Sequence, residues 1–254
     1  MINKTSIILD IIEYVQKARV SAQVRQAHLA KQGKKCDVTE RILERTLEFE
    51  KWLESELAKQ VTAHPAYSWF SRVKGVGNIN IGKVIGMIDI KKADRISKLW
   101  RYAGFGVNSD GKAERQVKGE KLHYNKTLKA MCWRLGKSLI RAKGKYYEFY
   151  LAEKEKILRR EQEKGKKIVP SSELPKVKNK HVENDEYIGL GHVDMMALRK
   201  MIKLFLSHLW ISWRISAGLP ITEPYIVSKG GHNIIEPEEM TEKPLTEKKS
   251  TEKD

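Results

Sequence analysis

Residues 71–82 read Ser71-Arg72-Val73-Lys74-Gly75-Val76-Gly77-Asn78-Ile79-Asn80-Ile81-Gly82. Two glycines, Gly75 and Gly77, flank one apolar residue, and short apolar segments lie on either side of them. Glycine lets the backbone turn sharply and approach another surface closely. Such a turn leaves the first amide N–H groups of the next helix unpaired, so these groups can hold an anion. The pattern predicts a helix–hairpin–helix, with helices over residues 66–73 and 78–87.

Positive charge is concentrated around this turn. The chain has 254 residues and a formal net charge of +17, and residues 71–150 contain 19 Lys and Arg against 6 Asp and Glu. A basic zone of this kind favours a polyanion as the partner. We therefore expect contacts to the phosphate backbone of duplex DNA with weak sequence preference. The alternatives are RNA as the partner, or a lysine-rich surface that only aids solubility.

Helical periodicity accounts for most of the remaining chain, and the sequence predicts an all-α fold. Apolar spacing indicates helices over residues 5–31 and 37–60, joined by a short basic loop at Gly33. We expect an antiparallel helical arm over residues 1–64, which either forms a homodimer as a coiled coil or packs on the main core. The helix–hairpin–helix DNA-binding domain is expected over residues 65–165.

The C-terminal part of the chain divides into three segments. Pro170 and Pro175, with two serines between them, indicate a flexible linker over residues 166–190. A C-terminal helical segment follows over residues 191–235, and its helix over residues 194–217 is predicted to lie at the centre of the core. The tail over residues 236–254 is rich in Glu, Lys, Thr and Pro, and we expect it to be disordered.

The predicted helix over residues 126–142 is strongly amphipathic. Its apolar residues share one face, whereas Arg134, Lys137 and Arg141 recur on another face at spacings of three and four. A basic stripe of this kind is either a solvated surface or a track for a nucleic-acid backbone. Its position beside a predicted phosphate-binding turn favours the track.

The sequence offers little for metal or redox chemistry. Its 7 histidines are scattered, and Cys36 and Cys132 have no partner at ligand spacing, so we expect no metal, no cofactor and no disulfide framework. A two-metal nuclease needs several converging carboxylates, whereas Asp89 and Asp94 are predicted to cap helices. No stretch is long and apolar enough to span a bilayer, so we expect no membrane partner and a cytoplasmic location.

A polar loop after Gly106 contains the one candidate nucleophile. Ser109 is followed by Asp110-Gly111-Lys112, and Arg115 and Lys118 lie close by in the sequence. Such a loop can bring a hydroxyl group to a phosphate, with cations to stabilise the developing charge. The alternative is that Ser109 is simply a turn residue.

Several short motifs occur in a fixed order between Trp69 and Tyr150. They are Val73-Lys74-Gly75-Val76-Gly77, Leu99-Trp100-Arg101-Tyr102-Ala103-Gly104, Ser109-Asp110-Gly111-Lys112, Asn125 with its following helix, and Tyr146-Tyr147-Glu148-Phe149-Tyr150. This ordered set resembles the C-terminal helix–hairpin–helix domain of the DEDD insertion-sequence transposases, some of which use a bridge RNA. The resemblance covers about 80 residues.

The resemblance implies DNA binding, an origin in a prokaryotic mobile element, and Ser109 as the nucleophile. The resolvase-like, metal-binding N-terminal domain of that family has no counterpart in residues 1–65. Catalysis would therefore need a partner that supplies metal-bound carboxylates, and DNA binding without catalysis is the first expectation. An active transposase or recombinase subunit is the second, and an RNA-binding or protein-interaction module is the third.

The expected DNA-contacting residues lie on the turn, the polar loop and the basic helix. They are Lys74, Gly75, Val76, Gly77, Asn78, Lys83, Lys112, Arg115, Lys118, Arg134, Lys137 and Arg141.

Overall fold

The computed structural model describes residues 4–108, 111, 113, 119, 122–222 and 235–242. These residues are mostly helical, which confirms the expected all-α fold. They form two compact units. Unit 1 consists of Met1–Tyr67 with Gly77–Asp89, and unit 2 consists of Ser68–Val76 with Ile90–Asp254.

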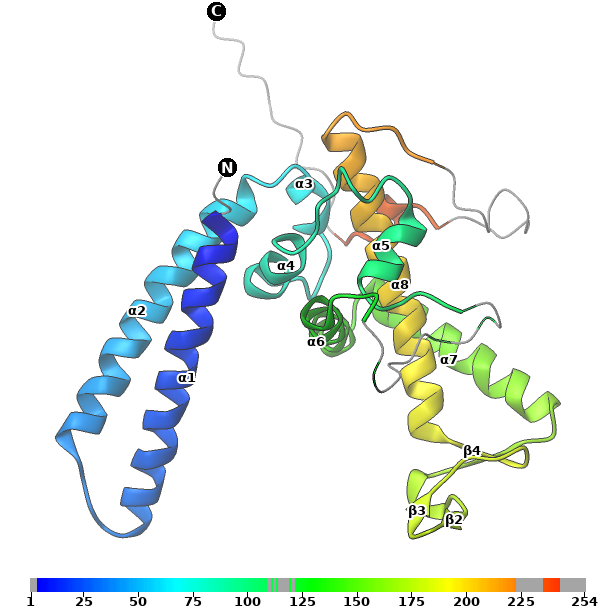
Figure 1. The fold of residues 1–254 in the computed structure, drawn as a ribbon, viewed down its shortest axis with the longest axis horizontal. Coiled ribbons are helices and arrows are strands. Elements are labelled where there is room, and N and C mark those ends of the chain that lie inside the picture. Colours follow the sequence, from blue (N-terminus) through cyan, green and yellow to red (C-terminus); the bar gives the residue numbers. More distant parts are fainter. Residues whose placement is uncertain are drawn as a thin grey trace, which may run out of the picture. The chain divides into compact units, whose positions relative to one another are not determined.

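Unit 1 is built on an antiparallel pair of long helices (Figure 1). Helix α1 (Lys4–Lys31) and helix α2 (Asp37–Thr62) lie side by side along their length, as the sequence predicts. The short helix α4 (Asn78–Ile85) packs on both of them. Gly82 makes this packing possible, because a Cβ atom there would lie 3.1 Å from Leu57 Cδ1 and 3.3 Å from Val61 Cγ2.

A buried polar cluster fixes the middle of this arm. The carboxylate of Glu50, which is 8% exposed, accepts hydrogen bonds from Gln16 Nε2 and from the Arg19 guanidinium. A buried carboxylate is tolerated only when such donors surround it. The cluster therefore sets the register between α1 and α2.

Unit 2 is organised around helix α8 (Leu190–Ser216), which lies at its centre as predicted. Helices α5 (Ile96–Tyr102), α6 (Lys126–Ala142) and α7 (Lys145–Glu163) all pack on α8 (Figure 1). At the end of α8, Trp210 Nε1 donates to Ala93 O at 2.6 Å, and buried Arg214 donates to Ile90 O at 2.8 Å. These bonds satisfy backbone carbonyl groups that precede α5.

The segment expected to be a flexible linker instead contains short strands. Strand β1 (Lys167–Val169) pairs in parallel with β4 (Tyr187–Gly189), and β2 (Lys176–Val177) pairs with β3 (Lys180–His181) in a hairpin. The hairpin loop consists of Lys178 and Asn179, both with positive φ (47° and 60°). Positive φ at both loop residues is typical of a two-residue β-hairpin turn, which usually has Gly, Asn or Asp at these positions. Because Lys178 is none of these, the turn was not predicted from the sequence.

The tail expected to be disordered is ordered in its first part. Residues 237–240 form a 3₁₀ turn, Pro237–Met240, in which Pro237 and Met240 are buried. Two apolar side chains and several polar contacts hold this segment, although its composition predicts no core contribution. Residues 243–254 lie outside the described residues.

The predicted domain boundaries differ from the compact units. The first helix of the predicted hairpin spans only Tyr67–Phe70 (α3), with turns continuing to Val76, and the second spans Asn78–Ile85. Helix α4 belongs to the arm, whereas the turn before it and α8 belong with α5–α7. Two of the boundaries between the units fall inside the predicted motif, one between Tyr67 and Ser68 and one between Val76 and Gly77.

Candidate nucleic-acid interface

Helix α6 presents opposite chemistry on its two sides. Asn125 caps its start, because the Asn125 side chain accepts the Leu128 N–H at 3.0 Å. One side is buried through Leu128, Met131, Cys132, Leu135, Gly136 and Leu139. The opposite side exposes Lys126, Arg134, Lys137 and Arg141. The helix contains no acidic residue over its 17 positions.

Within the part of the chain that the structure describes, no carboxylate forms an ion pair with the exposed cations on α6. On the other helices many basic residues form ion pairs, for example Arg41 with Asp37 and Arg159 with Glu155. Among the described residues, Lys126, Lys137 and Arg141 make no ion pair, and Arg134 contacts only the sulfur of Met131, at 3.9 Å. The exposed side of α6 therefore projects positive charge that no carboxylate in the described part of the chain pairs with.

The glycine turn is packed against the C-terminal half of α6. Gly75 has φ of +92°, and a Cβ atom there would lie 2.7 Å from Ala142 Cβ and 3.0 Å from Ser138 O. Ser138 Oγ donates to Gly75 O at 2.9 Å. Glycine is thus required here for close packing and for the backbone conformation.

This packing brings Lys74 to the end of α6. Lys74 is exposed. A Cβ atom added at Gly144, two residues after α6 ends, would lie 3.0 Å from the Cβ atom of Lys74. Lys143 and Lys145 are exposed on either side of Gly144. We call the set formed by Lys74, Lys126, Arg134, Lys137 and Arg141 the basic face. It joins two groups of residues that are about 60 positions apart in the sequence.

The structure separates the remaining predicted contacts. Gly77, Asn78 and Lys83 belong to unit 1, while Lys74, Gly75 and Val76 belong to unit 2. Gly77 has φ of −92°, precedes α4 and has no atom within 4 Å of an added Cβ, so neither strain nor crowding requires glycine there. Ser109, Lys112, Arg115 and Lys118 lie outside the described residues.

Sequence reasoning missed Lys126 and the lysines that flank Gly144. Lys126 is the first residue of α6, on its exposed side. Lys143 follows the helix in the left-handed conformation, with φ of 53°. The signal for these residues was that basic residues also occupy the first position of the helix and continue past its C-terminal end.

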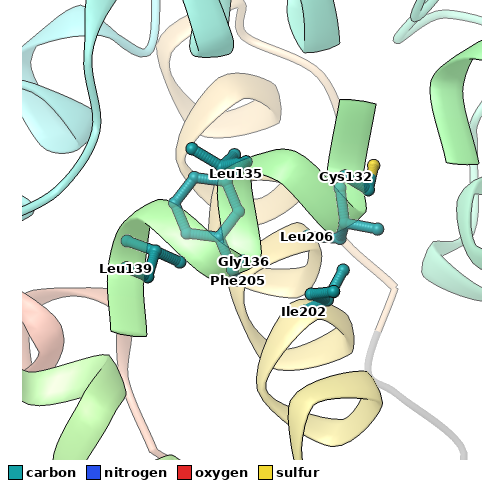
Figure 2. A pocket seen from close by; sticks show the side chains of 7 residues that line it. All are labelled: Cys132, Leu135, Gly136, Leu139, Ile202, Phe205 and Leu206. Carbon is teal, nitrogen blue, oxygen red and sulfur yellow. The ribbon is translucent and has the colours of Figure 1, made fainter. Parts of the chain in front are cut away.

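The apolar side of α6 packs tightly on α8 (Figure 2). Leu135 and Leu139 of α6 meet Ile202, Phe205 and Leu206 of α8, with Gly136 at the crossing. A Cβ atom at Gly136 would lie 2.8 Å from Ile202 Cδ1. Burial raises the pKa of the Cys132 thiol to about 12. The contact between α6 and α8 leaves no space for a water molecule. It therefore holds the two helices together and is not a ligand site.

The described residues offer no metal centre, since no group of three or more His, Cys, Asp or Glu side chains is placed to hold an ion. Both cysteines are free. Within the same part of the chain, no helix combines the length and apolar character needed to cross a membrane. Comparison with known proteins gives no match to a family model, a curated protein or a solved structure.

Proposed function

We propose that the protein binds duplex DNA through the basic face, with contacts mainly to phosphates. The observation that carries this proposal is the uncompensated charge of α6: four exposed cations, no acidic residue and no ion pair among the described residues. A basic surface that only aids solubility does not require this arrangement, and on helices α2 and α7 most of the cations form ion pairs.

The dimensions of the face suit a polyanion. At 1.5 Å rise per residue, Lys126 and Arg141 are separated by about 22 Å along the helix. Duplex DNA carries one phosphate charge per about 1.7 Å of its axis, so every cation on this face can find a phosphate. Five contacts correspond to a log–log salt slope of about −4.5. All five side chains of the face are Lys or Arg, which suit phosphate contacts, and we expect weak sequence preference.

The test is fluorescence anisotropy with duplex DNA across a salt gradient. The triple variant Arg134→Gln/Lys137→Gln/Arg141→Gln should reduce the slope to about −2 and weaken binding by between about tenfold and 500-fold near 0.1 M salt. The matched control is Arg41→Gln/Arg45→Gln/Lys59→Gln, which removes the same charge from ion-paired positions on α2. Equal losses in the two triple variants would refute the basic face as the binding surface.

Single-stranded DNA and duplex RNA are the comparison ligands in the same assay. Preference for duplex DNA supports the proposal, whereas equal competition by RNA would replace it with an RNA-binding function. We further propose that the protein acts in the cytoplasm as a DNA-binding component of a mobile element. The resemblance of residues 69–150 to the transposase domain supports this role. The described residues hold no carboxylate cluster, so the proposal stops at binding.

Self-association through the arm is a second proposal, and it rests on exposed apolar side chains. Ile7, Ile11 and Tyr14 share one face of α1 by their spacing, and Tyr14 is 72% exposed. On α2 the corresponding side chains recur at spacings of four, seven and three residues: Val38, Ile42, Phe49 and Trp52. The Phe49 and Trp52 rings stack, with centroids 5.7 Å apart.

The two sets lie on one side of the arm. At 100° per residue, the α2 set is rotated by about 100° and the α1 set by about 140° in the same sense from the core-facing line of its own helix, and the helices are antiparallel. We propose that a second copy of the chain covers this side in a homodimer. Sedimentation velocity should show a dimer that Phe49→Glu/Trp52→Glu converts to a monomer. Val20→Glu/Val24→Glu is the control, because those side chains are also exposed (48% and 52%) but point elsewhere. A monomeric wild type would refute the proposal.

A further inference from the structure

The described part of the C-terminal tail is an acidic segment docked on unit 2. We call residues 235–242 the acidic strap. It contains four glutamates and no Lys or Arg: Glu236, Glu238, Glu239 and Glu242. It follows a chain whose net charge is strongly positive. Its placement beside the turn at Gly75 is the feature that neither the fold nor the proposed DNA binding explains.

A few specific contacts anchor the strap. Trp69 Nε1 donates to Pro237 O at 2.9 Å, in a buried setting. His208 Nε2 is 2.8 Å from Ile235 O, and His208 Nδ1 is 2.8 Å from the Tyr146 hydroxyl. Because a carbonyl oxygen only accepts, Nε2 carries the proton and Nδ1 accepts from Tyr146. Met240 is the other buried anchor.

The strap carboxylates lie on groups that suit phosphates. Glu238 pairs with the guanidinium of Arg72 at 2.6 Å, and the Arg72 side chain is only 11% exposed. Glu242 Oε1 accepts the backbone N–H of Lys145, the first residue of the 19-residue helix α7, at 2.8 Å. A guanidinium and a helix N-terminus are the groups by which proteins hold phosphates.

These two contacts adjoin the basic face. Glu242 N donates to Arg72 O, at the residue just before the turn that carries Lys74. Glu242 Oε1 also lies against Gly144, where the Lys74 side chain packs. The strap therefore ends at the point where the turn meets the C-terminal end of α6. Glu238 is 62% exposed, so solvent and salt reach its ion pair.

We propose that the acidic strap is an intramolecular competitor of DNA at this end of the basic face. When docked, its carboxylates occupy Arg72 and the start of α7. When DNA displaces it, those groups add phosphate contacts to the basic face. The inference rests on the proposed DNA binding.

The first test compares duplex affinities of full-length variants. Glu238→Gln/Glu242→Gln removes the two competing charges but retains side chains that can still accept hydrogen bonds. The control Glu163→Gln/Glu173→Gln removes two exposed glutamates of the same unit. The strap variant should bind at least about fivefold more tightly than the control, with a salt slope steeper by one to two, since each added phosphate contact contributes about 0.9.

The second test measures hydrogen exchange of the strap in the wild type. The Glu242 amide is bonded to Arg72 O in the docked strap and should lose protection when saturating duplex DNA is added. If the wild type binds DNA but the two double variants have equal affinities and the Glu242 amide keeps its protection, the strap is only a structural clasp and the inference is wrong. Absence of DNA binding in every variant would overturn both the inference and the proposed function.

Discussion

Substitution of Gly75 by alanine separates a packing role from a purely local turn. In the structure the added Cβ would lie 2.7 Å from Ala142 Cβ, 3.0 Å from Ser138 O and 3.1 Å from Leu139 Cα. These atoms are backbone or fixed to it, so the turn and α6 must separate. Forced overpacking costs about 1–3 kcal/mol. A non-glycine residue with φ of +92° adds about 1–2 kcal/mol. We therefore expect Gly75→Ala to reduce the free energy of unfolding by about 3 kcal/mol.

The matched control is Gly77→Ala, two residues away. Gly77 has an ordinary negative φ and open space around its Cα. The substitution should therefore change the protein's free energy of unfolding by less than about 0.5 kcal/mol. Urea denaturation followed by tryptophan fluorescence and by circular dichroism measures both effects. Equal stabilities of the two variants would refute the argument that Gly75 is held by its contact with α6. Because Lys74 precedes this glycine, Gly75→Ala should also weaken duplex binding at low salt.

Two further predictions concern buried polar groups. Glu50→Ala should destabilise the arm by about 2–3 kcal/mol, because the Arg19 guanidinium loses its buried partner. The control Glu48→Ala breaks the exposed pair with Arg45 and should cost at most about 0.5 kcal/mol. Comparable urea midpoints for the two variants would contradict this prediction. Burial lowers the pKa of His208 to about 4. Between about pH 6.5 and pH 4 the folded state therefore binds fewer protons than the unfolded chain. The contribution of His208 should thus lower the free energy of unfolding by up to about 3 kcal/mol as the pH decreases over this range. His208→Gln should flatten this dependence, leaving the part due to His64, whose pKa burial also lowers to about 4; an unchanged slope of urea midpoint against pH would show that His208 does not titrate on unfolding.

The helices could be predicted from the sequence wherever apolar residues at helical spacing form one continuous stripe. The arm helices, the amphipathic helix α6 and the central helix α8 follow the predicted positions within a few residues, because each buries such a stripe. The sequence did not reveal the strands inside the expected linker, because β1–β4 are only two or three residues long. Such strands are too short to show an alternating pattern, and their pairing is decided by partners distant in the sequence.

The candidate site was only partly predictable. Arg134, Lys137 and Arg141 share an exposed face because helical spacing determines it. Whether their charges are neutralised depends on which acidic side chains the fold brings near, and periodicity carries no such information. The two glycines of the turn look equivalent in the sequence, yet only Gly75 is packed on α6.

By itself, the sequence determined the all-α class, the amphipathic character of α6 and the concentration of positive charge between residues 71 and 150, since these follow from local spacing and composition. Only the tertiary structure decided that the predicted hairpin is divided between two units, that Lys74 lies at the end of α6, and that an acidic tail segment docks beside it. These outcomes depend on contacts between residues about 60 to 170 positions apart, such as Ser138 with Gly75 and Trp69 with Pro237. Contacts at that separation are selected by the shape and burial of the whole unit, which no local pattern encodes.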